Sequence, residues 1–192
     1  MPNRAAIVAL AGRRIDAADT RVERFPLHGI GVVAGRLRAL FGRLRCTTLV
    51  CSAANGADLV ALQVARELGL RTRIVLPFAA ARFREVSVVD RPGGELWGWL
   101  FDDLVREARA AGDLVVLASR GKSQHDAFAA ANERIVDEAI ALARAGRRTA
   151  AVAGVAVWDG ASRGKDDVTA ALVKRIRSNG LPVHAVPLGG RD

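Results

Sequence analysis

The chain is poor in the residues that build metal and disulfide sites. It has two cysteines and three histidines in 192 residues, and no Cys-x-x-Cys pair. Cys46 and Cys51 stand at the two ends of one predicted strand, so they should lie about 16 Å apart, well beyond the roughly 7 Å that a disulfide allows. We therefore expect no disulfide within the subunit, no zinc site and no cofactor.

Long apolar runs are also missing. No run approaches the roughly 20 residues of a membrane-spanning helix. The start, Met1-Pro2-Asn3-Arg4 followed by the apolar run 5–10, is too short for a signal peptide with its cleavage site and indicates a first strand instead. We expect a cytoplasmic protein with no membrane partner.

Lysine and tyrosine are scarce although the net charge is +9. There is no tyrosine, and only Lys122, Lys165 and Lys174 are lysines, so arginine supplies nearly all the positive charge. The arginines are scattered through every segment, with no cluster interleaved with aromatic residues that could stack on bases. We therefore expect no nucleic-acid partner and keep DNA binding only as an alternative.

What the sequence does contain is an alternation of apolar strands and amphipathic helices. Its hydrophobic content of 51% and charged content of 26% are those of a globular chain of one domain. The predicted strands are 5–11, 47–52, 71–76, 113–118, 149–158 and 183–186, and the predicted helices are 28–45, 57–68, 95–110, 124–145 and 166–178. This order predicts an α/β fold: a single-domain, Rossmann-like, doubly wound and mainly parallel sheet with helices on both faces. Residues 78–94 are expected to form a long irregular loop of the kind that often serves as a lid or binding loop.

The turn after the second predicted strand is the clearest candidate for a ligand site. It consists of small residues, and a helix is expected to begin at about Gly56 or Ala57, so a ligand could approach its main chain and the first free N–H groups of the helix. Ser52, Asn55 and Asp58 would supply the polar side chains. The alternative is that Gly56 only permits the turn and Asp58 only caps the helix.

Three short segments match known phosphate- or nucleotide-binding motifs in part of their sequence, but each lacks a residue or a preceding strand that the motif requires. Residues 29–34 match a dinucleotide fingerprint, but no strand immediately precedes them. Residues 121–123 match the end of a P-loop without its leading glycine, which leaves only a weaker anion contact from Lys122 open. Residues 92–94 match the start of the phosphoribohydrolase motif, but Leu100 stands where that motif has its glutamate.

Polar residues follow four of the predicted strands and should meet at the carboxyl edge of the sheet. They are Gly12, Arg13, Arg14 and Asp16 after the first strand; Ser52, Asn55, Gly56, Ala57 and Asp58 after the second; Ser119, Arg120 and Lys122 after the fourth; and Asp159, Gly160, Gly164, Lys165, Asp166 and Asp167 after the fifth. Arginine and lysine suit phosphate, while aspartate and asparagine suit ribose hydroxyls. We expect phosphate near Arg13 and Arg14 and sugar hydroxyls near the aspartates, with N-capping as the alternative role of Asp166 and Asp167.

Asn132 adds a candidate from the fourth predicted helix. It falls on the apolar face between Phe128 and Ile135. A buried amide needs hydrogen-bond partners, so Asn132 is expected to hold a neighbouring loop or to face the ligand. On the third predicted helix, Trp99 falls off the inward face and marks a candidate subunit contact, which leaves a homodimer open.

Taken in order, these motifs resemble the SLOG superfamily. The resemblance rests on Gly12-x-Arg14-Ile15-Asp16, on Ser52–Asp58, on Leu76-Pro77-Phe78, on Ala131-Asn132 and on Val157-Trp158-Asp159-Gly160. SLOG domains are Rossmann-like domains related to the LOG phosphoribohydrolases, to the DNA-processing protein DprA and to the N-terminal domains of TRPM channels. In this chain Arg13 replaces a usual histidine, and Gly164-Lys165-Asp166 stands where Gly-Gly-Thr is common.

The resemblance implies a pocket for a nucleotide or a nucleotide-derived molecule, such as an ADP-ribose-like compound or a cyclic nucleotide, that the protein binds or senses. One alternative is a phosphoribohydrolase or N-glycosidase that acts on nucleoside monophosphates and uses Asp16, Asp58 or Asp159 as acid or base. Another is DprA-like binding of single-stranded DNA.

Overall fold

The computed structural model describes residues 4–118, 123–146, 150–162, 164 and 167–189. In these segments the chain forms, in order, β1 (Ala6–Gly12), η1 (Leu27–Gly29), α1 (Ile30–Leu44), β2 (Cys46–Cys51), α2 (Ala57–Glu67), β3 (Arg71–Leu76), α3 (Ala80–Ser87), α4 (Gly94–Ala110), β4 (Leu114–Val116), α5 (Gln124–Ala145), β5 (Ala151–Val157), α6 (Val168–Ser178) and β6 (Val183–Val186).

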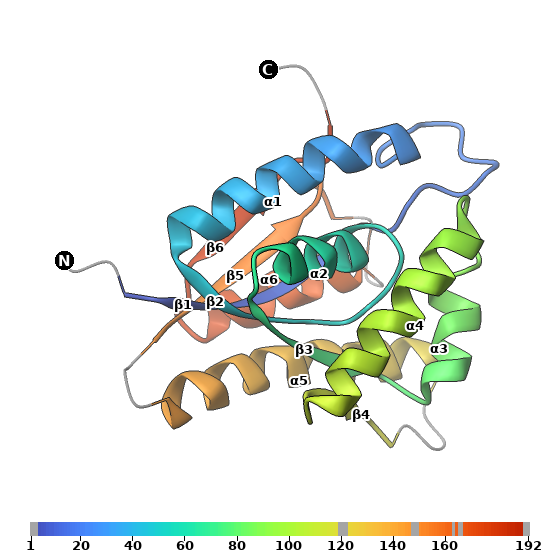
Figure 1. Ribbon diagram of the computed structural model, residues 1–192. Helices are drawn as coiled ribbons and strands as arrows, with labels where there is room; N and C mark the ends of the chain where they lie inside the picture. The colour runs from blue at the N-terminus through green and yellow to red at the C-terminus, as the bar shows by residue number, and fades with distance from the viewer. Residues whose placement is uncertain (1–3, 119–122, 147–149, 163, 165–166, 190–192) are drawn as a thin grey trace.

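The strands form one six-stranded sheet in the order β4-β3-β2-β1-β5-β6 (Figure 1). All five neighbouring pairs are parallel. The predicted α/β, doubly wound, Rossmann-like architecture is therefore confirmed. Successive strands move outward on one side of β1 as far as β4, and the chain then crosses to the other side of β1 for β5 and β6.

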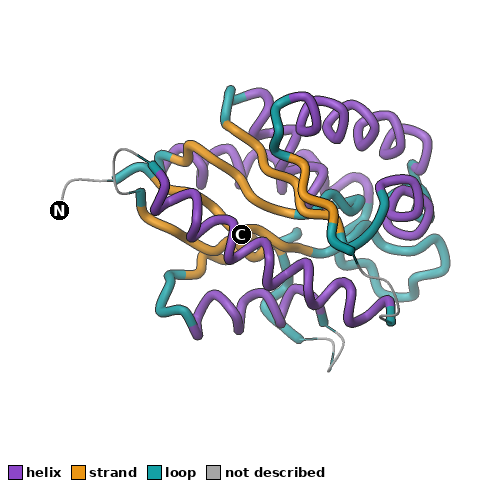
Figure 2. The backbone as a smooth tube through the Cα atoms, turned by 90° about the horizontal axis from the view of Figure 1, so that it is seen from below, coloured by secondary structure: helices purple, strands orange, loops and turns teal. Residues whose placement is uncertain are grey.

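Helices cover both faces of the sheet, as the two views of the backbone show (Figures 1 and 2). The central strand β1 explains why both faces need cover, because its side chains alternate between two buried clusters. Val8 and Leu10 join the cluster that contains the inward faces of α1, α2, α3 and α4. Ile7, Ala9 and Ala11 join the cluster made with α5 and α6.

Most element boundaries agree with the sequence predictions to within three residues. β3, α5 and β6 have the predicted bounds. The Ser123–Asp126 cap is also present, since Ser123 Oγ accepts a hydrogen bond from the Asp126 N–H at 3.1 Å. Cys46 and Cys51 are both buried free thiols.

Residues 78–94 differ from the prediction of one long irregular loop, because they contain helix α3. Phe83 of α3 is fully buried and stacks on Phe101 of α4, with ring centroids 5.9 Å apart. Phe78 and Phe128 pack around the same ring. These contacts join segments far apart in sequence, and they fix a short helix in which half of the eight residues are polar.

The strand order creates a topological switch point between β1 and β5 at the carboxyl edge of the sheet. Between β1 and β5 the chain connections leave in opposite directions, and in open α/β sheets ligands bind in the crevice at this switch point. β4 lies three strands away from β1, which corresponds to about 14 Å at the usual strand spacing. None of the described helices is both long and apolar enough to cross a membrane.

Candidate functional site

Two adjoining cavities open at the carboxyl ends of the strands near this switch point. The outer cavity has a volume of about 510 Å³, and Gly12, Arg13, Arg14, Ile15, Asp16, Ala17, Thr20, Val22, Arg24, Arg91, Asp167, Val168 and Thr169 line it. Four arginines and two aspartates are among these residues. The outer cavity therefore combines cationic groups with hydrogen-bond acceptors.

The inner cavity is smaller and largely apolar. It has a volume of about 190 Å³, and Leu10, Ala11, Gly12, Arg14, Ser52, Ala54, Asp58, Phe83, Val86, Ser87, Gln124, Phe128, Ala131, Asn132, Ile135, Val168 and Thr169 line it. Gly12, Arg14, Val168 and Thr169 belong to both linings, so the two cavities meet there. One elongated ligand could therefore reach from one into the other.

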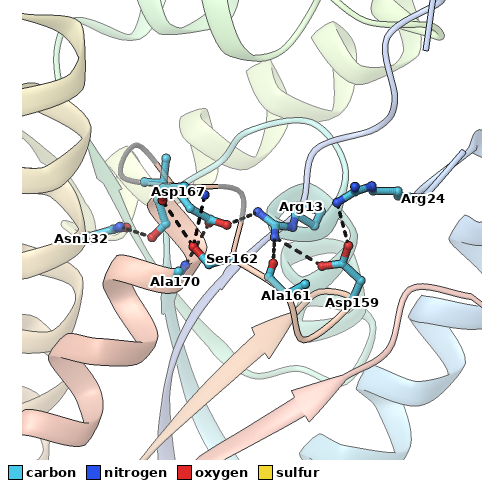
Figure 3. Close-up of polar contacts among 10 residues, drawn as sticks. Arg13, Arg24, Asn132, Asp159, Ala161, Ser162, Asp167 and Ala170 are labelled. Carbon is cyan, nitrogen blue, oxygen red and sulfur yellow. Dashed lines mark hydrogen bonds and ion pairs between the residues drawn. The ribbon is translucent and has the colours of Figure 1, made fainter. Parts of the chain in front are cut away.

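Arg13 is committed to contacts within the protein (Figure 3). Its Nη1 donates to Asp167 Oδ2 at 2.8 Å, and its Nη2 donates to Asp159 Oδ1 at 3.3 Å and to the Ala161 carbonyl at 2.5 Å. The side chain is only 6% exposed. Arg13 thus fastens the end of β1 to the loop after β5 and to the start of α6, and its guanidinium is already neutralised by two carboxylates.

Asp16 and Asp159 also serve the local structure. Asp16 Oδ2 accepts hydrogen bonds from the N–H groups of Arg24 and Phe25, both at 2.7 Å, and thereby closes the loop after β1. Burial raises the pKa of Asp159, but the hydrogen bond and charge of Arg13 outweigh it and hold that pKa below its usual value. Asp159 also pairs with Arg24 at 3.0 Å.

Arg14 and Arg91 are less fully neutralised. Arg14 Nη2 pairs with Asp90 Oδ1, and Arg91 Nε lies 3.7 Å from Asp90 Oδ2. One carboxylate is thus shared between two guanidinium groups at the wall of the outer cavity. This arrangement leaves a local excess of positive charge that suits an anion.

The structure corrects the expectation that the turn after β2 offers its main chain to a ligand. Gly56 has φ +86°, and a Cβ at this position would lie 2.7 Å from both the Arg13 carbonyl oxygen and the Ile15 nitrogen. The Ala57 N–H donates to that same Arg13 carbonyl at 3.0 Å. The backbone after β1 covers this turn, so Gly56 and Ala57 join two loops of the protein.

Asn55 is likewise turned into the protein. It is fully buried, its N–H donates to the Ser87 carbonyl at 2.9 Å and its Nδ2 donates to the Val88 carbonyl at 2.9 Å. These bonds anchor the end of α3 against the turn after β2. They hold in place the segment that carries Phe83, Val86 and Ser87 into the inner cavity.

Asp58 is the carboxylate that lies within the inner cavity. Its Oδ2 accepts a hydrogen bond from the Ala54 N–H at 3.3 Å, whereas its Oδ1 is buried with no hydrogen-bond partner among the described residues. Burial raises the pKa of Asp58 to about 7, although the Ala54 N–H and the charge of Arg14 oppose this. Ser52 Oγ and Arg14 Nε are also buried without a partner in the described part of the chain.

The remaining predicted residues divide into four groups. Asn132 Nδ2 donates to the Val168 carbonyl at 2.6 Å, so this residue holds the start of α6 and also lines the inner cavity. Gly160 and Gly164 have φ of +80° and +105° and lie in the loop between β5 and α6. Lys122, Lys165 and Asp166 lie outside the described residues, as do Ser119 and Arg120. Asp167 caps α6, accepting from the Ala170 N–H at 3.0 Å.

Several lining residues were not predicted from the sequence. Arg24 and Arg91 line the outer cavity, and Phe83 and Phe128 line the inner one. The sequence signal for Arg91 was its place in a loop of the kind that binds ligands. For Phe83 and Phe128 there was no signal beyond an apolar helix face, which cannot distinguish a cavity wall from a filled core. The described residues contain no group of three or more His, Cys, Asp or Glu side chains placed to hold a metal ion.

Comparison with known proteins identifies a similar fold. No protein-family model and no curated protein matches the chain. Among solved structures, DNA processing protein A (DprA) from Streptococcus pneumoniae is similar, with 17% sequence identity and a TM-score of 0.46 over 97% of this chain. The chain spans 50% of the length of that DprA chain. DprA is one of the proteins related to the SLOG superfamily, and at this level the similarity concerns the fold alone.

Proposed function

We propose that the protein binds a nucleotide or a nucleotide-derived small molecule across the two cavities. The observation that carries this proposal is the pairing of an apolar cavity, walled by two phenylalanines, with a larger cavity that contains arginines and carboxylates. A nucleotide has the same two parts, since an aromatic ring is joined through a sugar to phosphate. The summed volume of the two cavities falls within the range usual for small-molecule sites.

In the proposed pose the ring occupies the inner cavity, against the wall that Phe83 and Phe128 form together. The phosphate lies at the wall of the outer cavity, near Arg14 and Arg91, because these two share the single carboxylate of Asp90. The sequence analysis placed the phosphate near Arg13 and Arg14, whereas this pose leaves Arg13 out, because two carboxylates already pair with it. The sugar then lies where the cavities meet, beside Thr169.

A thermal-shift panel tests the proposal, with NAD, ADP-ribose, AMP, ATP and cyclic mono- and dinucleotides as probes. A ligand present at 100 times its dissociation constant adds about 2.7 kcal/mol to the free energy of unfolding. For a chain of this length that corresponds to a rise in Tm of roughly 5–10 °C. No shift with any of these probes would refute the proposal.

A matched pair of variants locates the phosphate. Arg91→Ala should weaken binding of a phosphate-bearing probe about tenfold or more, because a charge-assisted contact is lost. Arg43→Ala should leave binding unchanged, since Arg43 is exposed near the end of α1, which leads to the opposite edge of the sheet. Isothermal titration calorimetry would measure both, and equal effects would contradict the placement.

Hydrolysis of the bound nucleotide is the second candidate function, and the position of Asp58 favours it. Of the three carboxylates considered for acid or base chemistry, only Asp58 lines the inner cavity, and burial raises its pKa to about 7, close to the working range of a general acid. Asp16 and Asp159 are engaged in closing loops. Release of free base from AMP, and its loss in Asp58→Asn, would establish turnover; no base after prolonged incubation would leave binding alone.

Association of two copies stays a prediction that the surface of α4 can test. Leu96 and Trp99 are 70% and 67% exposed and lie three residues apart, so they are neighbours on the helix surface. If they form a subunit contact, Trp99→Ser should convert a dimer to a monomer in sedimentation velocity. DNA binding stays the alternative to these proposals, and it requires an affinity that falls steeply with salt.

A further inference from the structure

The inner cavity contains buried polar atoms that the described residues leave without partners. Asp58 Oδ1 and Ser52 Oγ are two of them, and each belongs to a residue that lines the cavity. A buried polar atom without a hydrogen bond is costly, so two such atoms on residues that line one cavity indicate a partner that a ligand supplies. Around them the wall is apolar, with Leu10, Phe128 and Ile135 among its residues.

The two carboxylate oxygens of Asp58 differ in their surroundings. Oδ2 accepts the Ala54 N–H at 3.3 Å, so it is the oxygen that carries no proton. Oδ1 has no donor among the described residues and is therefore the oxygen that would carry the proton when the carboxyl is neutral. A protonated Oδ1 would donate a hydrogen bond into the cavity, whereas an ionised carboxylate could only accept one.

Few charged groups face Asp58. Arg14, from the loop after β1, favours the ionised form, and the Cys51 thiol of β2 lies beside it with a pKa raised mainly by burial. The residues that α3, α5 and α6 contribute to the cavity carry no charge. Seating an aromatic ring would remove remaining water and strengthen the desolvation that favours the neutral acid.

We propose that Asp58 recognises the ring of the bound nucleotide as a neutral carboxylic acid, donating a hydrogen bond from Oδ1 to a ring acceptor such as an unprotonated ring nitrogen, with the Ser52 hydroxyl as second contact. This rests on the proposed function and adds to it the chemistry of the ring edge and a consequence for binding. The protein binds its ligand more tightly in acid than in alkaline solution. Where the protein responds to a nucleotide, it would therefore also respond to pH.

ADP-ribose is the probe, because it carries adenine and its diphosphate keeps its charge across neutral pH. If the acid form alone is competent and titrates at about 7, the dissociation constant should rise about 30-fold between pH 6 and pH 8.5. Asp58→Asn, whose amide also donates, should bind with a pH-independent affinity close to that of the native protein in acid. Asp58→Ala should bind weakly at every pH, and Asp103→Asn, at an exposed position on α4, should behave like the native protein.

The outcomes separate the inference from the function it rests on. A dissociation constant that is independent of pH in the native protein overturns the inference and leaves nucleotide binding standing. Two other results would show that an ionised carboxylate accepts a hydrogen bond from the ring, and each would overturn the inference. One is tighter binding as the pH rises, and the other is loss of binding in Asp58→Asn while its circular dichroism spectrum is native. Failure of ADP-ribose to bind at any pH overturns the inference as well, and the nucleotide panel then decides the proposed function by itself.

Discussion

Asp58→Asn should stabilise the protein against unfolding in alkaline solution, by an amount that grows with pH. The pKa of Asp58 rises from 3.8 to about 7 on folding, and one unit corresponds to about 1.4 kcal/mol, so the ceiling is about 4 kcal/mol. Because the folded pKa is the higher one, the stability linked to this group is fully present below 3.8 and is lost as the pH rises through 7. Between pH 5 and pH 8 the loss is about 2.5 kcal/mol.

The measurement is the difference in Tm between the native protein and Asp58→Asn at a series of pH values. The asparagine can keep the Ala54 N–H bond and carries no charge, so the titration of every other group cancels in the difference. From pH 5 to pH 8 the difference should move in favour of the variant by roughly 5–10 °C. Asp103→Asn, which removes an exposed carboxylate, should show no such trend. A difference between the native protein and Asp58→Asn that stays constant with pH would refute the reasoning.

Three further predictions concern the framework of the site. Gly56→Ala places a Cβ against backbone atoms at φ +86° and should lower the free energy of unfolding in urea by about 2–5 kcal/mol. Gly69→Ala, at φ +66° with open space around it, should lower it by about 1 kcal/mol, and equal losses would contradict the close approach at Gly56. Arg13→Met leaves two carboxylates without their buried partner and should lower the free energy of unfolding by about 3–5 kcal/mol. Replacing the exposed Arg24 with Met should lower it by less than about 1 kcal/mol, and an equally small loss for Arg13→Met would show that its ion pairs do not stabilise the fold. Asp113→Asn should cost about 1–3 kcal/mol at pH 7, because hydrogen bonds from two arginines of β3 hold the pKa of Asp113 below its usual value. That contribution is present above the unfolded pKa and lost as the pH falls, so the difference from the native protein should shrink in acid; a difference unchanged below pH 4 would contradict it.

The fold was predictable because each central element carries its own signal. β3, β6 and α5 have the predicted bounds, since a strand between polar turns and a helix with a Ser123 cap are both marked by local residues. α3 was missed because its helical state depends on Phe83, whose partners Phe101 and Phe128 come from two later helices. The residue pattern within the eight residues of α3 cannot indicate contacts with such distant helices.

The candidate site was predictable in its location more than in its roles. Asp58, Arg14 and Asn132 were predicted to contact a ligand, and all three line the cavities; that they bind one stays a prediction. The roles of Arg13 and Arg14 could not be told apart from the sequence, because adjacent residues on an extended segment point to opposite sides. Which side meets two carboxylates depends on where the loop after β5 lies. Arg91 was not among the predicted residues, since its place beside Arg14 follows from the packing of α3 and α4.

The sequence by itself determined the alternation of strands and helices and the polar residues that follow four of the strands, because these depend on side chains close together in the chain. The tertiary structure alone decided the strand order, and with it the switch point between β1 and β5 where the cavities open. It also decided which polar residues form hydrogen bonds and ion pairs within the protein and which keep buried atoms without a partner. Arg13 and Asp58 differ in this respect because the first meets two carboxylates from distant loops, while the second meets apolar walls.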